Sequence, residues 1–174
     1  IDILNPIIIL EPVGKNTAPA ILAAALHTIE ESHDAVLLVL SADHVIQNIE
    51  AFHEAIKIAL NHVILGKLAT FGIVLTRPDA GYGYIKSSKN IINGAFKVEK
   101  FIEKPNLKIA RKYFKQGGYL WNSGMFCFSV GAMLEEMDIH CPEILETTQN
   151  CLAQAKKVSG QEIDQVEIAP EHFK

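Results

Sequence analysis

An acid and a histidine stand side by side where an apolar segment ends, in LLVLSADHVI at residues 37–46. A carboxylate such as Asp43, at the end of a strand, can bind Mg²⁺ together with the phosphate groups of a substrate. Asp is also favoured in solvated turns and as a helix N-cap, and spacing alone favours that alternative. We expect the neighbouring His44 to be a structural histidine with satisfied hydrogen bonds rather than a ligand.

Two more segments place polar groups after apolar runs. GKNTAPA, residues 14–20, lacks the second glycine of a P-loop, but it leads into a predicted helix whose N-terminus offers free N–H groups. Asn16 and Thr17 can hydrogen-bond a base or a sugar there, although helix capping alone explains them better on this evidence. In DAGYGY, residues 79–84, glycine lets a ligand approach the backbone closely, and an ordinary turn is the alternative.

Three polar residues in the second half suit a sugar phosphate. Lys104 offers a point charge for a phosphate and Glu103 an acceptor for hydroxyl groups, with a surface ion pair as the alternative. Asn122 lies within an otherwise apolar predicted strand, so its amide must find partners. A bound sugar can supply these partners, and so can the backbone.

The apolar pattern of the first half predicts alternating strands and helices. The strands are expected at residues 7–11, 35–40 and 67–75, and the helices at 16–33 and 50–65. This order predicts a parallel sheet with right-handed crossovers, and the wholly apolar run 35–40 predicts a strand buried on both faces. Because ligands bind at the carboxyl ends of parallel strands, we expect the three following loops to meet at one edge.

The second half predicts strands at 81–88 and 95–105 around the turn Asn93–Gly94, and a helix at 106–118 closed by Gly117 and Gly118. A strand interrupted by Gly124 follows, and then two helices near 131–137 and 144–157. We assign no structure to the polar tail after residue 159. One α/β domain is expected to cover residues 1–174.

Composition excludes some classes of function. The 174 residues carry a net charge of -4 with scattered Lys and Arg, which predicts no nucleic-acid partner. No apolar run reaches the roughly 18 residues of a membrane helix, so no membrane partner is expected. The isolated cysteines, which lie at positions 127, 141 and 151, predict reduced thiols in a cytoplasmic protein.

Five blocks stand in an order that resembles the sugar-1-phosphate nucleotidyltransferases. Within that family the chain is most similar to bacterial mannose-1-phosphate guanylyltransferases, including bifunctional ones that carry an isomerase domain. The resemblance runs from Ile7 to Pro142. The blocks are ILEPVGKNTAPAI, LLVLSADHVI, GKLATFGIVLTRPDAGYGYI, VEKFIEKP and GGYLWNSGMFCF.

The resemblance implies an incomplete Rossmann-like (GT-A-like) nucleotidyltransferase domain, with a mostly parallel sheet flanked by helices. It implies that GTP and mannose 1-phosphate give GDP-mannose and pyrophosphate with Mg²⁺ as cofactor, and it leaves homo-oligomerisation open. Asp43 would hold the metal, and Lys104 would contact the sugar phosphate as a second catalytic residue. The remaining positions implied in substrate binding are Asn16 and Thr17 at the guanine, Gly83 near the sugar nucleotide, and Glu103 and Asn122 on mannose hydroxyls.

The sequence also departs from the family pattern. The glycine-rich loop that supplies a catalytic Arg is missing, and so is a tryptophan-rich block with a second metal-binding Asp. Lys15 stands where Arg is usual and Ser41 where Pro is usual, and Lys cannot make the bidentate contact that Arg makes. We therefore expect the chain to be the central segment of a catalytic domain, without guanylyl transfer of its own.

Two alternatives stay open at this point. The chain can belong to a nucleotidyltransferase for another sugar or base, which thermal stabilisation by GTP, dTTP and UTP would distinguish. It can also be a non-catalytic binding module with a nucleotidyltransferase-like fold. A glycine-rich loop upstream in the reading frame would exclude that module.

Overall fold

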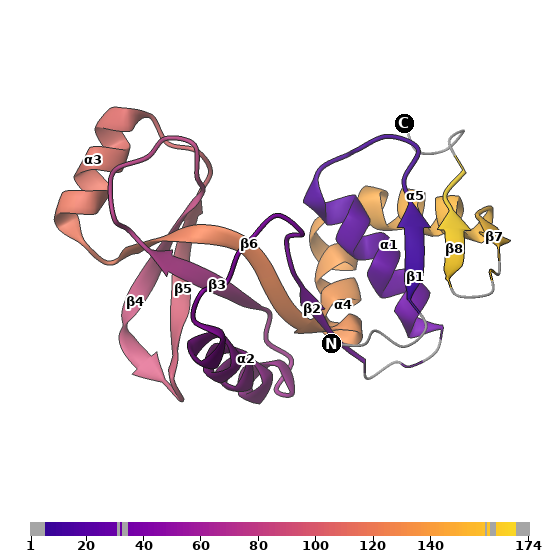
Figure 1. The fold of residues 1–174 in the computed structure, drawn as a ribbon, viewed down its shortest axis with the longest axis horizontal. Coiled ribbons are helices and arrows are strands. Elements are labelled where there is room, and N and C mark those ends of the chain that lie inside the picture. The colour runs from indigo at the N-terminus through magenta and orange to yellow at the C-terminus, as the bar shows by residue number, and fades with distance from the viewer. Residues whose placement is uncertain (1–5, 31, 33–34, 159, 161–162, 170–174) are drawn as a thin grey trace. The chain divides into compact units, whose positions relative to one another are not determined.

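The computed structural model describes residues 6–30, 32, 35–158, 160 and 163–169. The chain forms two compact units (Figure 1). Unit 1 comprises residues 1–36 and 129–174, and unit 2 comprises residues 37–128.

Unit 1 packs three helices with a small sheet. Its helices are α1 (Thr17–Ile29), α4 (Val130–His140) and α5 (Pro142–Ala153), and they contact one another. Its strands are β1 (Ile7–Leu10), β7 (Lys156–Val158) and β8 (Asp164–Glu167), in the order β1-β8-β7. Strand β8 is parallel to β1 and antiparallel to β7. Buried side chains hold the helices together, among them Leu22, Met137 and Leu145.

Strand β8 corrects the prediction that the tail has no structure. Ile168, just after β8, donates its N–H to the Leu10 carbonyl at 3.0 Å and packs with Ala23 and Cys151 in the core. Val166 is also buried. The alternation of Val166 and Ile168 is a strand signal, but it is too short to predict a partner at the other end of the chain.

Unit 2 is built on the long strand β6 (Tyr119–Ser129), whose last residue belongs to unit 1. The five-stranded sheet has the order β2-β6-β4-β5, and β3 also pairs with β6. Its other elements are β2 (Val36–Val39), α2 (Ile49–Val63), β3 (Ala69–Val74), β4 (Tyr84–Ile92), β5 (Ala95–Ile102) and α3 (Leu107–Gln116).

The predicted helices and strands confirm the α/β class, but the predicted parallel pairing of the first three strands is wrong. Strand β1 belongs to the sheet of unit 1, while β2 and β3 both pair with β6. Strand β6 runs antiparallel to β3 and β4, and the hairpin β4–β5 is antiparallel as well. The three predicted ligand loops therefore do not share the edge of one parallel sheet.

The predicted burial of the second strand on both faces is also wrong. In β2, Val36 is 39% exposed and Leu38 is 37% exposed. In the order β2-β6-β4-β5, β2 is an edge strand that pairs with β6 on one side. An apolar run therefore indicated a strand correctly but overstated how much of the strand is covered.

Side-chain caps begin three of the described helices, with Asn48 at α2, Asn106 at α3 and Ser129 at α4. The Asn106 carboxamide oxygen accepts the Ile109 N–H at 3.0 Å, and Asn48 caps α2 in the same way. At α1, Asn16 occupies the N-cap position with φ 72°, and its side chain forms no cap hydrogen bond. The capping alternative for the Asn16 side chain is therefore wrong, and Thr17 is the first residue of the helix.

Replacing Asn106 with Ala is expected to lower the free energy of unfolding by about 1 kcal/mol, because the first turn of α3 loses an acceptor. Asn106→Asp should change it by less than about 0.5 kcal/mol, since Asp keeps an acceptor at the N-cap position. Urea denaturation of both variants measures the difference. Equal losses would contradict the assignment of this cap.

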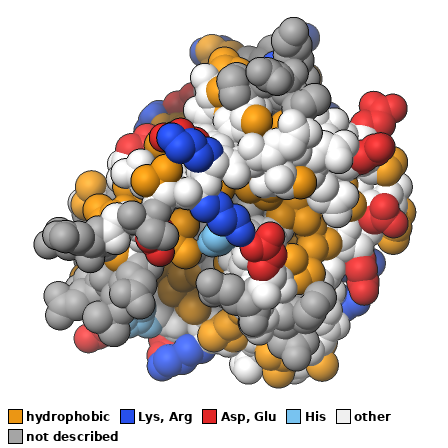
Figure 2. Space-filling view, turned by 90° about the vertical axis from the view of Figure 1, so that its right-hand side faces the viewer, with side chains coloured by type: hydrophobic (Ala, Val, Ile, Leu, Met, Phe, Trp, Pro, Cys, Tyr) orange, Lys and Arg blue, Asp and Glu red, His pale blue; other side chains and the backbone are white. Residues whose placement is uncertain are grey.

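The surface mixes apolar and charged side chains. Figure 2 shows hydrophobic side chains that reach the surface between dispersed charged ones. Within the described ranges, no helix is both long and apolar enough to cross a membrane.

Candidate functional site

A bulge in β6 organises the polar residues of unit 2. Thr70 of β3 pairs with Phe126 but Gly72 pairs with Asn122, so β6 uses more residues than β3 over this stretch. We call residues 122–125 the β6 bulge. Gly124 within it has φ +74°, a conformation that L side chains rarely adopt. Strand β6 continues through this residue, so the predicted interruption is a bulge and not a break. Bulges often re-aim side chains beside binding sites.

Hydroxyl groups tie the β6 bulge to β3. The Ser123 Oγ donates to the Phe71 carbonyl at 2.6 Å and accepts the Met125 N–H at 3.1 Å. The Thr70 Oγ1 lies 3.2 Å from Asn122 Oδ1 and 3.3 Å from the Met125 carbonyl oxygen. Sequence reasoning missed Thr70 and Ser123, although a hydroxyl residue within an apolar strand needs a partner and is a usable signal.

Two of the predicted residues, Glu103 and Asn122, converge around a third, Gly83. The Asn122 N–H donates to the Gly83 carbonyl at 2.8 Å. A Cβ atom on Gly83 would lie 2.9 Å from Glu103 Oε2 and 3.5 Å from the Asn122 Cβ. Any side chain at Gly83 would therefore displace the carboxylate of Glu103. The structure thus brings together residues from the loop before β4, the segment just after β5 and the middle of β6.

Lys104 follows Glu103 of this cluster and has an uncommon backbone conformation. Its Nζ is 3.4 Å from Glu103 Oε1, and the two side chains are 65% and 61% exposed. The predicted surface ion pair is therefore present, and such exposed pairs contribute about 0–1 kcal/mol. Lys104 has φ 37°, which is uncommon for a residue other than glycine and is found more often at functional sites. Its cation stays accessible to an anionic ligand.

Asp43 lies in the exposed turn after β2, where it forms no hydrogen bond or ion pair with another described residue. A Cβ atom on Gly124 would lie 3.7 Å from Ser41 Oγ, so the segment containing Ser41 passes beside the β6 bulge. His44 is exposed and has no hydrogen bond in the described part of the chain, so the prediction of a satisfied structural histidine is wrong. In the part of the chain that the structure describes, no three His, Cys, Asp or Glu side chains lie close enough together to hold a metal ion.

Asn16 and Thr17 belong to unit 1, at the N-terminus of α1. Because capping does not use the Asn16 side chain, its polar atoms are available to a ligand there. The assignment of these two residues to a base stays a prediction.

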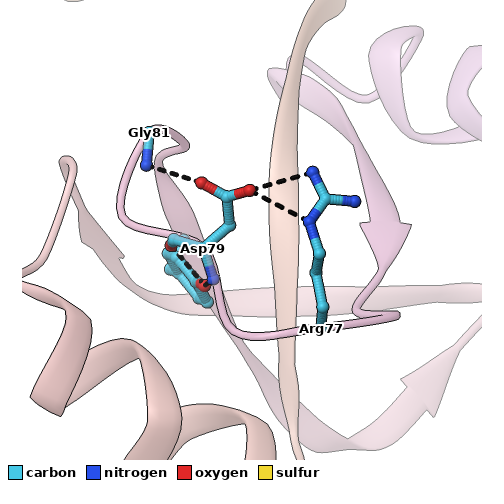
Figure 3. A network of polar contacts seen from close by, with 4 residues as sticks. Arg77, Asp79 and Gly81 are labelled. Carbon is cyan, nitrogen blue, oxygen red and sulfur yellow. Dashed lines mark hydrogen bonds and ion pairs between the residues drawn. The ribbon is translucent and has the colours of Figure 1, made fainter.

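A network that the sequence did not predict fixes the loop before Gly83 (Figure 3). Asp79 Oδ1 accepts the Gly81 N–H at 2.9 Å, and Asp79 Oδ2 accepts from Arg77 Nη2 at 2.9 Å. The Tyr84 hydroxyl accepts the Asp79 N–H at 3.0 Å and donates to the Asp79 carbonyl at 2.7 Å. The Arg77 guanidinium lies 5.5 Å from the centroid of the Trp121 ring. Both ends of the loop are therefore held in place.

Stability should depend on the ionisation of Asp79. The Gly81 N–H and then the Arg77 guanidinium lower the pKa of Asp79, although partial desolvation opposes them. The ionised form then stabilises the folded state above the ordinary Asp value of about 3.9, and this contribution is lost as the pH falls below it. We expect Asp79→Asn to lower the melting temperature at pH 7 and to matter less near pH 2. Thermal denaturation across this range checks it, and a difference that does not change with pH would refute it.

The thiols agree with the predicted structural role. Cys127, Cys141 and Cys151 are free, and Cys127 and Cys151 are buried. Burial raises the pKa of the Cys127 and Cys151 thiols, which keeps them protonated and unreactive.

Comparisons with known proteins match this chain over most of its length. The Nucleotidyl transferase family model matches residues 4–165. Mannose-1-phosphate guanylyltransferase RfbM of Salmonella typhimurium strain LT2 is 44% identical over 175 residues, covering 99% of this chain and 36% of the relative. Mannose-1-phosphate guanylyltransferase of Escherichia coli is 46% identical over 149 residues, covering 84% and 32%. The chain thus spans about a third of the length of these curated relatives.

A solved structure whose title names a different activity shares the fold of this chain. The crystal structure of mannose-6-phosphate isomerase from Helicobacter pylori superimposes with a TM-score of 0.86 at 33% identity. The match covers 95% of this chain and 61% of that one.

Proposed function

Because the chain belongs to the nucleotidyl transferase family, we propose that it forms part of a catalytic domain that transfers a guanylyl group from GTP to mannose 1-phosphate. The products are GDP-mannose and pyrophosphate. The two curated relatives above are named mannose-1-phosphate guanylyltransferases, which supports this choice of substrates. The observation that carries the proposal is the convergence of Glu103 and Asn122 around the Cβ-free backbone of Gly83.

The cluster suits a sugar phosphate. The Glu103 carboxylate accepts hydrogen bonds from hydroxyl groups, and the Asn122 amide can donate to a neighbouring oxygen. Gly83 lets the sugar approach the backbone, since a side chain there would occupy the space beside Glu103. The exposed ammonium group of Lys104 can pair with the phosphate.

The reaction needs positioning and charge neutralisation more than covalent catalysis. A phosphate oxygen of mannose 1-phosphate attacks the α-phosphorus of GTP in line, and a new phosphorus–oxygen bond forms. The bond from the α-phosphorus to the oxygen bridging to the β-phosphate breaks, and pyrophosphate leaves with the electron pair. Lys104 would balance charge on the sugar phosphate, while Asn16 and Thr17 would contact the guanine.

Mg²⁺ fits the donor chemistry of Asp43. This carboxylate is exposed, and it forms no hydrogen bond or ion pair with the rest of the described chain that would compete for its oxygens. Mg²⁺ is commonly held by one or two carboxylates, substrate phosphates and water, so a single acid here suffices as an anchor. When bound, the ion would neutralise charge that develops on the phosphate oxygens.

A cytoplasmic location also fits the structure. The three cysteines are free thiols, and such thiols persist in reducing compartments.

Differential thermal stabilisation tests the proposed substrates. Melting temperatures are measured with Mg²⁺ and GTP, dTTP or UTP, each with and without mannose 1-phosphate. Since ligands that bind the native state raise the melting temperature, GTP should stabilise most and mannose 1-phosphate should add to it. Asp43→Ala should remove the Mg²⁺ dependence. Equal shifts with all three nucleotides would reject the guanylyl assignment.

A further inference from the structure

Asn122 is fixed at both its backbone and its side chain. Its N–H donates to the Gly83 carbonyl at 2.8 Å, and its Oδ1 accepts from Thr70 Oγ1 at 3.2 Å. Its Nδ2 has no partner within the described residues, and it is not one of the unpartnered atoms that are closed off from solvent there. The donor end of the amide is therefore open to a ligand.

The orientation of a carboxamide decides what it offers. Its oxygen end accepts hydrogen bonds and its nitrogen end donates two, and the two ends have nearly the same shape. The structure sets the oxygen end toward Thr70 Oγ1 at 3.2 Å, and because a hydroxyl can also accept, this orientation holds when its single proton points to the amide. Thr70 supplies this donor from β3, across the strand pair that the β6 bulge distorts.

We propose that Thr70 is a positioning residue of the sugar site. It holds the Asn122 side-chain oxygen toward β3, so that the amide nitrogen is presented as a donor near the Glu103 carboxylate, which is an acceptor. This inference rests on the proposed function and deepens it. A donor and an acceptor side by side fit two neighbouring hydroxyl groups, one that accepts from Asn122 and one that donates to Glu103.

The alternative is that Thr70 only stabilises the β6 bulge and does not orient the Asn122 amide. The Thr70 hydroxyl also lies 3.3 Å from the Met125 carbonyl oxygen, so it can instead brace the β6 bulge. That bulge already has a separate hydrogen bond to β3, which Ser123 Oγ donates to the Phe71 carbonyl. Thr70→Val keeps the shape and strand preference of the side chain and removes the donor, and Thr70→Ser keeps the donor.

Titration calorimetry with mannose 1-phosphate separates these roles. We expect Thr70→Val to weaken binding by about 3- to 10-fold, the range for one hydrogen bond, and Thr70→Ser to bind within about 2-fold of the unmodified chain. In the Asn122→Ala background, Thr70→Val should cause no further loss, because its effect passes through the amide. Full additivity of the two substitutions would overturn the proposal, and so would unchanged binding by Thr70→Val.

An NMR measurement without ligand decides the question independently. The side-chain amide resonances of Asn122 should shift in Thr70→Val and stay near their original positions in Thr70→Ser. Unchanged resonances in Thr70→Val would overturn the positioning role. If the unmodified chain does not bind mannose 1-phosphate, the proposed function fails, whereas these resonances still decide what Thr70 does.

Discussion

Replacing Gly72 with Ala is expected to lower the free energy of unfolding by about 1–3 kcal/mol, the usual cost of overpacking. The new Cβ would lie 2.5 Å from Leu120 Cδ1 and 2.9 Å from Leu120 Cβ. Rotating the side chain relieves the first contact but not the second, so the strands β3 and β6 must separate. Gly72 pairs with Asn122 in this ladder, so the separation would also disturb the β6 bulge.

Gly14→Ala is the matched control for this substitution. A Cβ atom on Gly14 would have no atom within 4 Å, and its backbone does not require a positive φ. Such a replacement should leave stability unchanged or raise it by up to about 1 kcal/mol, because the unfolded chain loses freedom. Urea denaturation of both variants gives the comparison, and the packing account of β3 and β6 fails if Gly72→Ala is as stable as Gly14→Ala.

Replacing Glu103 with Gln is expected to weaken binding of mannose 1-phosphate by about 10- to 100-fold. The substitution keeps the shape of the side chain but removes a charged acceptor, and hydrogen bonds to charged groups contribute about 1.5–3 kcal/mol. The stabilisation by GTP should stay unchanged if Glu103 contacts the sugar alone. Calorimetric titration with mannose 1-phosphate, beside a melting curve with GTP, measures both effects.

Glu99→Gln controls for the loss of a negative charge nearby, on the strand that precedes Glu103. Glu99 lies on β5, and its Oε2 pairs with Lys86 Nζ at 2.7 Å, with both side chains partly exposed. Its replacement should leave binding of mannose 1-phosphate as it was. If Glu99→Gln weakens binding as much as Glu103→Gln does, the effect is one of general charge and Glu103 has no specific role.

The helices could be predicted because their signals are local. Asn106 at the start of α3 and Gly117 after its end mark the helix within a few residues of sequence. Strand pairing could not be predicted in the same way, since β1 finds its parallel partner β8 more than a hundred residues along the chain. The order of strands and helices suggested crossovers between parallel strands, but the long β6 gives β3 and β4 antiparallel partners instead.

The residues of the candidate site could be singled out from the sequence, but the residues that hold them in place could not. Residue type and motif order pointed to Gly83, Glu103 and Asn122, and the structure brings these three together. Thr70 escaped prediction because its contact with Asn122 depends on the register of two strands and on a bulge. The Arg77–Asp79 contact spans two residues, yet its effect on the loop before Gly83 appears only once Tyr84 is buried beside it.

The most direct test of the central claim is a crystal structure of this chain with mannose 1-phosphate. We expect the sugar over Gly83, with neighbouring hydroxyl groups hydrogen-bonded to the Glu103 carboxylate and the Asn122 amide nitrogen. A sugar bound elsewhere, with Glu103 and Asn122 still facing solvent, would contradict it.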